Sequence, residues 1–99
     1  MIGLAMRAGK VIIGTEQVCL ALPKKGRVLL VLVSDGASDA TKKKLFVKCE
    51  FYSTRAIRIP LDTQTLGRTV GKTYSPACVA ITDASFAEAI GRIILSDEN

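Results

Sequence analysis

The residues with the clearest chemical potential surround Gly14, within the segment KVIIGTEQVCLAL at residues 10–22. We predict a short β-branched strand that ends at Gly14 and a helix that begins at Thr15. The first turn of a helix has backbone N–H groups without intrahelical partners and a partial positive charge, so it favours anions. Here that turn also carries Glu16 and Gln17, whose side chains can read the edge of a base or a sugar hydroxyl.

The overall charge favours an anionic partner. The chain has 14 Lys and Arg against 9 Asp and Glu, no histidine, and a formal net charge of +5 at pH 7. This basic balance, combined with a polar helix start, points to RNA. The helix start alone is weak evidence, because an exposed polar face needs no ligand and Gly-Thr is common where helices begin.

Two basic clusters could supply phosphate contacts. One is the run Lys42 to Lys44, and the other comprises Lys24, Lys25 and Arg27. Charges on an exposed helix face are usually only solvated, so solvation and phosphate contact both stay open as interpretations. Five or six such contacts would make binding strongly salt-dependent without giving it sequence specificity.

The sequence offers little equipment for catalysis. The segment GRTVGKT at residues 67–73 resembles the end of a phosphate-binding P-loop, but it has one residue too few between its glycines and shows helical spacing. In the absence of histidine, acid–base chemistry would fall to aspartates that stand where turns and helix starts need acceptors: Asp35, Asp39, Asp62 and Asp83. We therefore expect a protein that is not an enzyme, with no catalytic residue and no cofactor.

The cysteines and the hydropathy pattern indicate the compartment. Cys19, Cys49 and Cys78 are odd in number and stand in apolar patterns, as expected of buried hydrophobic residues in a reducing environment. We expect neither a metal site nor a disulfide. No apolar run is long enough to span a bilayer, and Arg7 interrupts the first apolar stretch before it could form a signal-peptide core. These features favour a cytoplasmic protein with no membrane partner.

The spacing of apolar residues predicts alternating helices and strands in a single domain, residues 1–99. We expect strands at Val11–Ile13, Val28–Val33, Ala56–Ile59 and Cys78–Ile81. The continuous apolar run at 28–33 is typical of a central strand that is covered on both faces. Five helices around four strands imply an α/β fold, a three-layer α-β-α sandwich with a mixed four-stranded sheet.

Turn and cap residues set the expected limits of the five helices. The first ends at Gly9, the second runs from Thr15 to Pro23, and the fourth begins at Asp62 or Thr63 and stops at Gly71. The third begins after Ser38 and runs to about Glu50 as an amphipathic surface helix, with Leu45 and Cys49 inside and lysines over much of the rest. For the fifth we predict a capping box of Ser85 and Glu88, with one apolar face formed by Phe86, Ile90, Ile93 and Ile94.

The chain resembles a known superfamily over nearly its full length. The matching stretches are RAGKVIIGTEQ at 7–17, DGASDATKKKL at 35–45, Cys49 to Tyr52, LGRTVGK at 66–72 and ACVAITDASFA at 77–87. They are similar to the kink-turn RNA-binding superfamily that includes archaeal ribosomal protein L-seven-Ae and eukaryotic L-thirty-e, especially to small bacterial members of the YlxQ type. This resemblance implies an α-β-α sandwich that binds kinked RNA stems at the start of the second helix and is not an enzyme.

The resemblance also implies where RNA binds. The family's glycine turn is followed by Asn-Glu and, three residues further, a Lys, and here these places hold Glu16, Gln17 and Leu20. Gln17 keeps an amide for a guanine edge, whereas Glu16 repels phosphates and Leu20 cannot donate a hydrogen bond. We therefore expect weaker, salt-sensitive binding. The family's second recognition loop corresponds to residues 72–76, where Tyr74 can stack on an extruded base.

The complete set of predicted RNA-binding residues is Lys10, Gly14, Thr15, Glu16, Gln17, Leu20, Lys24, Arg27, Lys43, Lys44, Lys72, Tyr74 and Ser75. The expected partner is structured RNA, either ribosomal RNA or a kink-turn stem in the context of translation, with ribosomal proteins as further partners of a monomer. Two alternatives stay open. One is a protein-interaction module with Leu20 and Tyr74 as anchors, and the other is an RNA-presenting domain that associates with a separate RNA-modifying enzyme.

Overall fold

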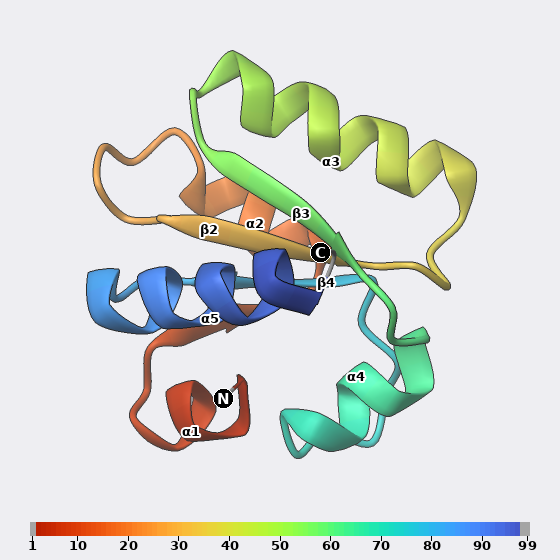
Figure 1. Ribbon diagram of the computed structural model, residues 1–99. Coiled ribbons are helices and arrows are strands. Elements are labelled where there is room, and N and C mark those ends of the chain that lie inside the picture. The colour runs from red at the N-terminus through yellow and green to blue at the C-terminus, as the bar shows by residue number, and fades with distance from the viewer. Residues whose placement is uncertain (1, 98–99) are drawn as a thin grey trace.

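The structure is a computed structural model that describes the backbone of residues 2–97 and the side chains of residues 2–94 (Figure 1). Helices and strands alternate along these residues, in the order expected from the sequence. The elements are α1 (Ile2–Arg7), β1 (Val11–Ile13), α2 (Thr15–Ala21), β2 (Leu30–Ser34), α3 (Asp39–Phe51), β3 (Arg55–Ile59), α4 (Thr63–Thr69), β4 (Cys78–Ile81) and α5 (Ala84–Asp97).

The four strands form one mixed sheet in the order β1-β4-β2-β3. Strands β2 and β3 are parallel and are joined through α3, whereas β4 is antiparallel to both of its neighbours. At the centre of the sheet, Val31 of β2 pairs with Ala56 on one side and with Ala80 on the other. All five residues of β2 are buried, which confirms that this strand is central.

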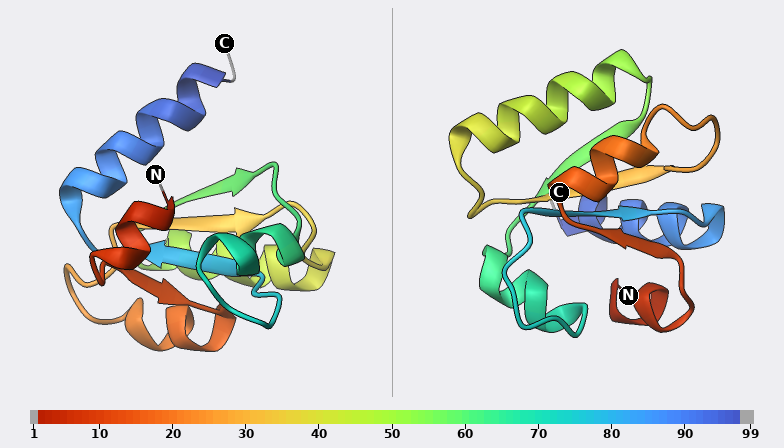
Figure 2. Two further views of the ribbon diagram at one scale, coloured as in Figure 1. Left: turned by 90° about the horizontal axis from the view of Figure 1, so that it is seen from below. Right: turned by 180° about the vertical axis from the view of Figure 1, so that it is seen from behind.

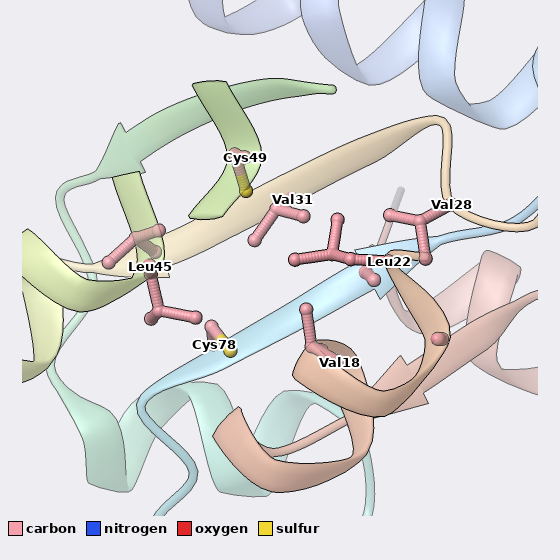
Figure 3. Close-up of a cluster of buried hydrophobic side chains, with 10 residues drawn as sticks. Val18, Leu22, Val28, Val31, Leu45, Cys49 and Cys78 are labelled. Atoms are coloured by element: carbon pink, nitrogen blue, oxygen red, sulfur yellow. The ribbon is translucent and has the colours of Figure 1, made fainter. Parts of the chain in front are cut away.

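Helices cover both faces of the sheet, so the predicted three-layer α-β-α sandwich is confirmed (Figures 1 and 2). Because successive side chains of a strand point to opposite faces, Val31 and Val33 pack with α2 and α3, and Leu30 and Leu32 pack with α1, α4 and α5. Figure 3 shows the first of these two cores, in which Val18, Leu45, Cys49 and Cys78 surround Val31. This core fixes α2 and α3 on the same face of the sheet.

The predicted bounds of two strands differ from the structure, and β3 begins at Arg55, one residue before the predicted start. The strand predicted at 28–33 begins at Leu30 and extends to Ser34. Val28 is nevertheless buried in the core with α2 and α3. The prediction included it in the strand because an apolar run indicates burial but not whether a residue pairs with a neighbouring strand. On α3, Leu45 and Cys49 are buried as predicted, and Val47 and Phe51, for which no prediction was made, are exposed among the lysines.

The capping box predicted at Ser85 is wrong. Helix α5 begins at Ala84, and an Asp83 carboxylate oxygen accepts a hydrogen bond from the Phe86 backbone N–H at 3.1 Å. The side chain of Glu88 instead forms an ion pair with Arg92 one turn later. Ile93, expected on the buried face, is exposed because the sheet covers only part of the apolar side of this helix.

Asp62 is the N-cap of α4, which agrees with the prediction that this helix begins at Asp62 or Thr63. Its Oδ1 accepts a hydrogen bond from the Thr65 backbone N–H at 2.6 Å, and the hydrogen bonds from Thr65 hold the pKa of Asp62 below its ordinary value. A carboxyl group with a lowered folded-state pKa stabilises the fold above its unfolded-state pKa of about 4. That stabilisation is lost as the pH falls through the folded-state pKa.

The Asp62→Asn variant keeps a capping oxygen but cannot titrate. We therefore expect its unfolding free energy to decrease less than that of the original chain as the pH is lowered from about 4 through the folded-state pKa of Asp62. Urea unfolding at a series of acidic pH values measures the difference. Parallel pH profiles for the two proteins would contradict this role of the Asp62 carboxylate.

Candidate functional site

Gly14 forms the open start of α2. Its backbone has φ 96° and ψ 150°, and no side chain caps the helix at this point. A Cβ built on Gly14 would meet no atom within 4 Å, so a ligand can approach the backbone closely. The first bond of the helix runs from the Val18 N–H to the Gly14 carbonyl, at 3.0 Å, so the amides of residues 15–17 precede the helical hydrogen-bond ladder. The side chains of Glu16 and Gln17 beside them are exposed.

A groove lies between α2 and α3, which run side by side over the same face of the sheet (Figure 2). Its volume is about 540 Å³, and we call it the α2–α3 groove. It is lined by Thr15, Glu16, Cys19, Leu20, Lys44 and Lys48. The structure thus brings four of the predicted site residues together: Thr15, Glu16, Leu20 and Lys44. Lys48 was absent from the prediction, although its spacing of four residues from Lys44 places both on one side of α3.

The predicted second loop, residues 72–76, passes directly over α4. An ideal Cβ on Gly67 would lie 2.3 Å from the backbone oxygen of Tyr74, so the loop can take this path only because residue 67 is glycine. The ring of Tyr74 is 53% exposed, and Ser75 is exposed beside it. In the sequence, Gly67 stood out as part of a P-loop-like segment and of the stretch at 66–72 that resembles the family, but neither pattern indicated this packing role. In the structure that segment is the end of α4 and the turn after it.

The start of α2 contacts the beginning of β4, the strand that follows the second loop. The Gly14 N–H donates a hydrogen bond to the Cys78 carbonyl at 3.0 Å, two residues after the loop ends. Lys72 is bonded to α4, because its backbone N–H donates a hydrogen bond to the Gly67 carbonyl at 2.8 Å. A direct backbone contact therefore joins the start of α2 to β4, the strand that follows the second loop.

Other predicted cations lie further from Gly14. Lys10 precedes β1, about 13 Å away at the rise of a strand. Lys24 and Arg27 are exposed in the turn after α2, at the opposite end of the helix from Gly14. Lys43 is exposed on α3 and does not line the groove. The structure thus places Lys24 and Arg27 away from the start of α2 and leaves Lys43 outside the groove lining.

Ion pairs distinguish the lysines of α3. Among residues 2–94, the Lys42 Nζ and the Arg58 Nε lie 3.7 Å and 3.5 Å from the Asp35 Oδ1. Asp35 is therefore placed to hold two cations, in keeping with a structural role. In the same part of the chain, neither Lys44 nor Lys48 takes part in an ion pair. Their charges are available to an anion in the groove.

The thiols belong to the core. Burial raises the pKa of the Cys49 thiol to about 11 and that of the Cys78 thiol to about 12. Both stay neutral at physiological pH and are poor nucleophiles. Within the described residues, no three His, Cys, Asp or Glu side chains come together as a metal site requires. Every helix along the described backbone is too short or too polar to cross a bilayer.

Comparisons with known proteins agree with the resemblance noted in the sequence. Residues 1–90 match the model of the Ribosomal protein L7Ae/L30e/S12e/Gadd45 family. RNA-binding protein YlxQ of Bacillus subtilis is 36% identical over 90 residues, which cover 91% of this chain and 87% of that protein. RNA-binding protein YlxQ of Enterococcus faecium is 32% identical over 94 residues, covering 95% and 87%.

A solved structure extends the agreement to three dimensions. A protein of unknown function from Bacillus halodurans superposes with a TM-score of 0.85 at 36% identity, and the match covers 94% of this chain and 91% of that one. The sequence match and the shared fold lead to one conclusion. The chain belongs to the Ribosomal protein L7Ae/L30e/S12e/Gadd45 family.

Proposed function

We propose that this protein binds structured RNA and catalyses no reaction. Family membership supports the proposal, and two relatives are named as RNA-binding proteins. The observation that carries it is the hydrogen bond from Gly14 to Cys78, which joins the uncapped start of α2 to β4, two residues after the loop that presents Tyr74. An open glycine backbone, an exposed amide side chain and an exposed aromatic ring then lie on connected segments, as recognition of a folded RNA requires.

The proposed ligand is a kink-turn stem in ribosomal or other translation-associated RNA, bound by one copy of the chain. The kink widens the groove of the stem, so that Gln17 reads a guanine edge and Tyr74 stacks on a base that leaves the helix. Lys44 and Lys48 neutralise phosphates along the α2–α3 groove. Glu16 can only accept hydrogen bonds, so it must face N–H groups of a base and not a phosphate.

The test is binding of a labelled kink-turn duplex, measured by fluorescence anisotropy at several salt concentrations. We expect the original chain to bind it more tightly than a duplex in which Watson–Crick pairs replace the kink. Affinity should fall steeply with added salt, because phosphate contacts release counterions. Equal affinity for the two duplexes would contradict recognition of the kink. If the protein bound neither duplex, the proposed function would be wrong.

The Gln17→Ala variant tests the base contact. Gln17 is exposed, so we expect the fold to be unchanged while affinity for the kink-turn duplex falls roughly 5- to 150-fold, the value of one bidentate base contact. The matched control is Gln64→Ala, which removes an exposed amide from α4. We expect the control to bind like the original chain. If both variants bind the kinked duplex as the original does, Gln17 makes no base contact.

A protein-interaction module is the second candidate. Leu20 is 61% exposed in the α2–α3 groove and Tyr74 is 53% exposed on the second loop, so both can act as apolar anchors for a partner protein. A complex held by these anchors survives nuclease treatment, whereas a complex held by RNA does not. Affinity purification with and without nuclease separates the two candidates.

A further inference from the structure

The outer face of α3 carries two large apolar side chains that the fold leaves uncovered. Val47 is 57% exposed and Phe51 is 78% exposed, and their spacing of four residues makes them neighbours on the helix surface. The ring of Tyr52 lies edge-on to that of Phe51, with the centroids 4.9 Å apart and the planes at 84°. Neighbouring exposed apolar side chains of this size indicate a surface that a partner covers.

Cations accompany these side chains. Lys44 and Lys48 each stand three residues before one of them, so the four residues form a continuous strip along the helix. We call Lys44, Val47, Lys48 and Phe51 the α3 strip. The two lysines also line the α2–α3 groove, so the strip begins in that groove and ends at Phe51, about 10 Å further along the helix axis.

The chemistry of the α3 strip suits unpaired nucleotides. Proteins that hold single-stranded RNA combine lysines along the phosphates with aromatic rings on which bases stack. A partner protein would also cover Val47 and Phe51. The lysines, however, favour an anionic partner, and the strip continues directly from the groove in which RNA phosphates are proposed to lie.

We propose that unpaired nucleotides adjoining the bound stem run along the α3 strip, with one base stacked on Phe51 and their phosphates at Lys44 and Lys48. This inference rests on the proposed function, because the strand enters from the α2–α3 groove. It adds a second recognition element that favours stems with a single-stranded flank. Stacking is tolerant of base identity, so the flank contributes affinity without a defined sequence.

The experiment compares two probes, a blunt kink-turn duplex and the same duplex with a short unpaired adenosine extension. We expect the extension to raise the affinity of the original chain roughly 5- to 150-fold, the value of one stacked base. In the Phe51→Ala variant this gain should disappear while affinity for the blunt duplex stays unchanged. The matched control is Leu4→Ala, which removes an exposed apolar side chain from α1, against the other face of the sheet, and should keep the gain.

A fluorescent adenine analogue in the extension reports stacking directly. The chain contains no tryptophan, so the fluorescence background of the protein is low. The analogue should be quenched on binding to the original chain and to Leu4→Ala, but not on binding to Phe51→Ala. A gain that persists in Phe51→Ala, or an extension that adds nothing to the original chain, overturns the proposal and leaves the surface to a protein partner.

A free adenosine oligomer separates this proposal from the proposed function. If the blunt duplex does not bind, the stem-binding function fails. Phe51-dependent quenching of the analogue in the oligomer then supports the α3 strip, and its absence overturns the strip as well. If Phe51→Ala weakens blunt and extended duplexes equally, Phe51 does not act on the unpaired flank and the proposal is overturned.

Discussion

The Gly14→Ala variant is expected to lose both stability and affinity for the kink-turn duplex. At φ 96° and ψ 150°, a residue with a Cβ is strained by about 1–3 kcal/mol, and the unfolding free energy decreases by that amount. The new methyl group also projects from the open start of α2, where the proposed RNA backbone approaches. Losing one phosphate contact to a backbone N–H should weaken binding roughly 10- to 150-fold.

The Gly26→Ala variant is the control for strain alone. Gly26 also has a positive φ, of 75°, with open space around an added Cβ, but it lies in the turn after α2. We expect this variant to lose stability in urea unfolding while its RNA affinity stays at the original value. If the two alanine variants bind RNA equally well, RNA does not approach the backbone at Gly14.

The Gly67→Ala variant is expected to displace the second loop. Its Cβ would lie 2.3 Å from the Tyr74 carbonyl oxygen and 3.2 Å from the Pro76 Cδ, so the loop must move away from α4. Overpacking of this kind costs about 1–3 kcal/mol of stability. Because Tyr74 moves with the loop, we also expect the loss of one stacked base, which lowers RNA affinity roughly 5- to 150-fold.

The Gly3→Ala variant provides the matched control. Gly3 lies in α1, and an added Cβ would meet the Thr69 carbonyl oxygen at 3.7 Å, an ordinary van der Waals contact. Alanine inside a helix is more favourable than glycine by about 0.5–1 kcal/mol, so stability should hold or rise. Urea unfolding and RNA titration of both variants test this prediction. If Gly67→Ala binds RNA as tightly as Gly3→Ala does, Tyr74 is not part of the RNA interface.

Local sequence signals predicted most elements because caps and turns act within a few residues. Ser38 caps α3, with its Oγ accepting a hydrogen bond from the Thr41 N–H at 3.2 Å, and Asp62 caps α4 in the same manner. The bounds of β1 and β4 agree with the predicted strands, since both are short apolar runs between turns. The start of α5 was predicted incorrectly because two residues, Asp83 and Ser85, offer equivalent capping oxygens.

Hydrophobic spacing was less informative for α3. Leu45 and Cys49 were expected inside and are buried, but the exposure of Val47 and Phe51 did not follow from their type. An apolar residue in a sequence reports that burial is favourable, whereas the position of the sheet decides which side of the helix is covered. The α3 strip could be identified only from the structure, which shows which side of α3 packs against the sheet.

The sequence alone determined which chemical groups are present: a basic chain, a glycine before a short helix, and a following turn with Glu16 and Gln17. Tertiary structure decided which groups act together. Helices α2 and α3 meet because both bury side chains on the same face of β2, and this contact brings Lys44 and Lys48 to a groove with residues far earlier in the chain. Periodicity shows which residues share one face of a helix, but only packing shows what that face meets.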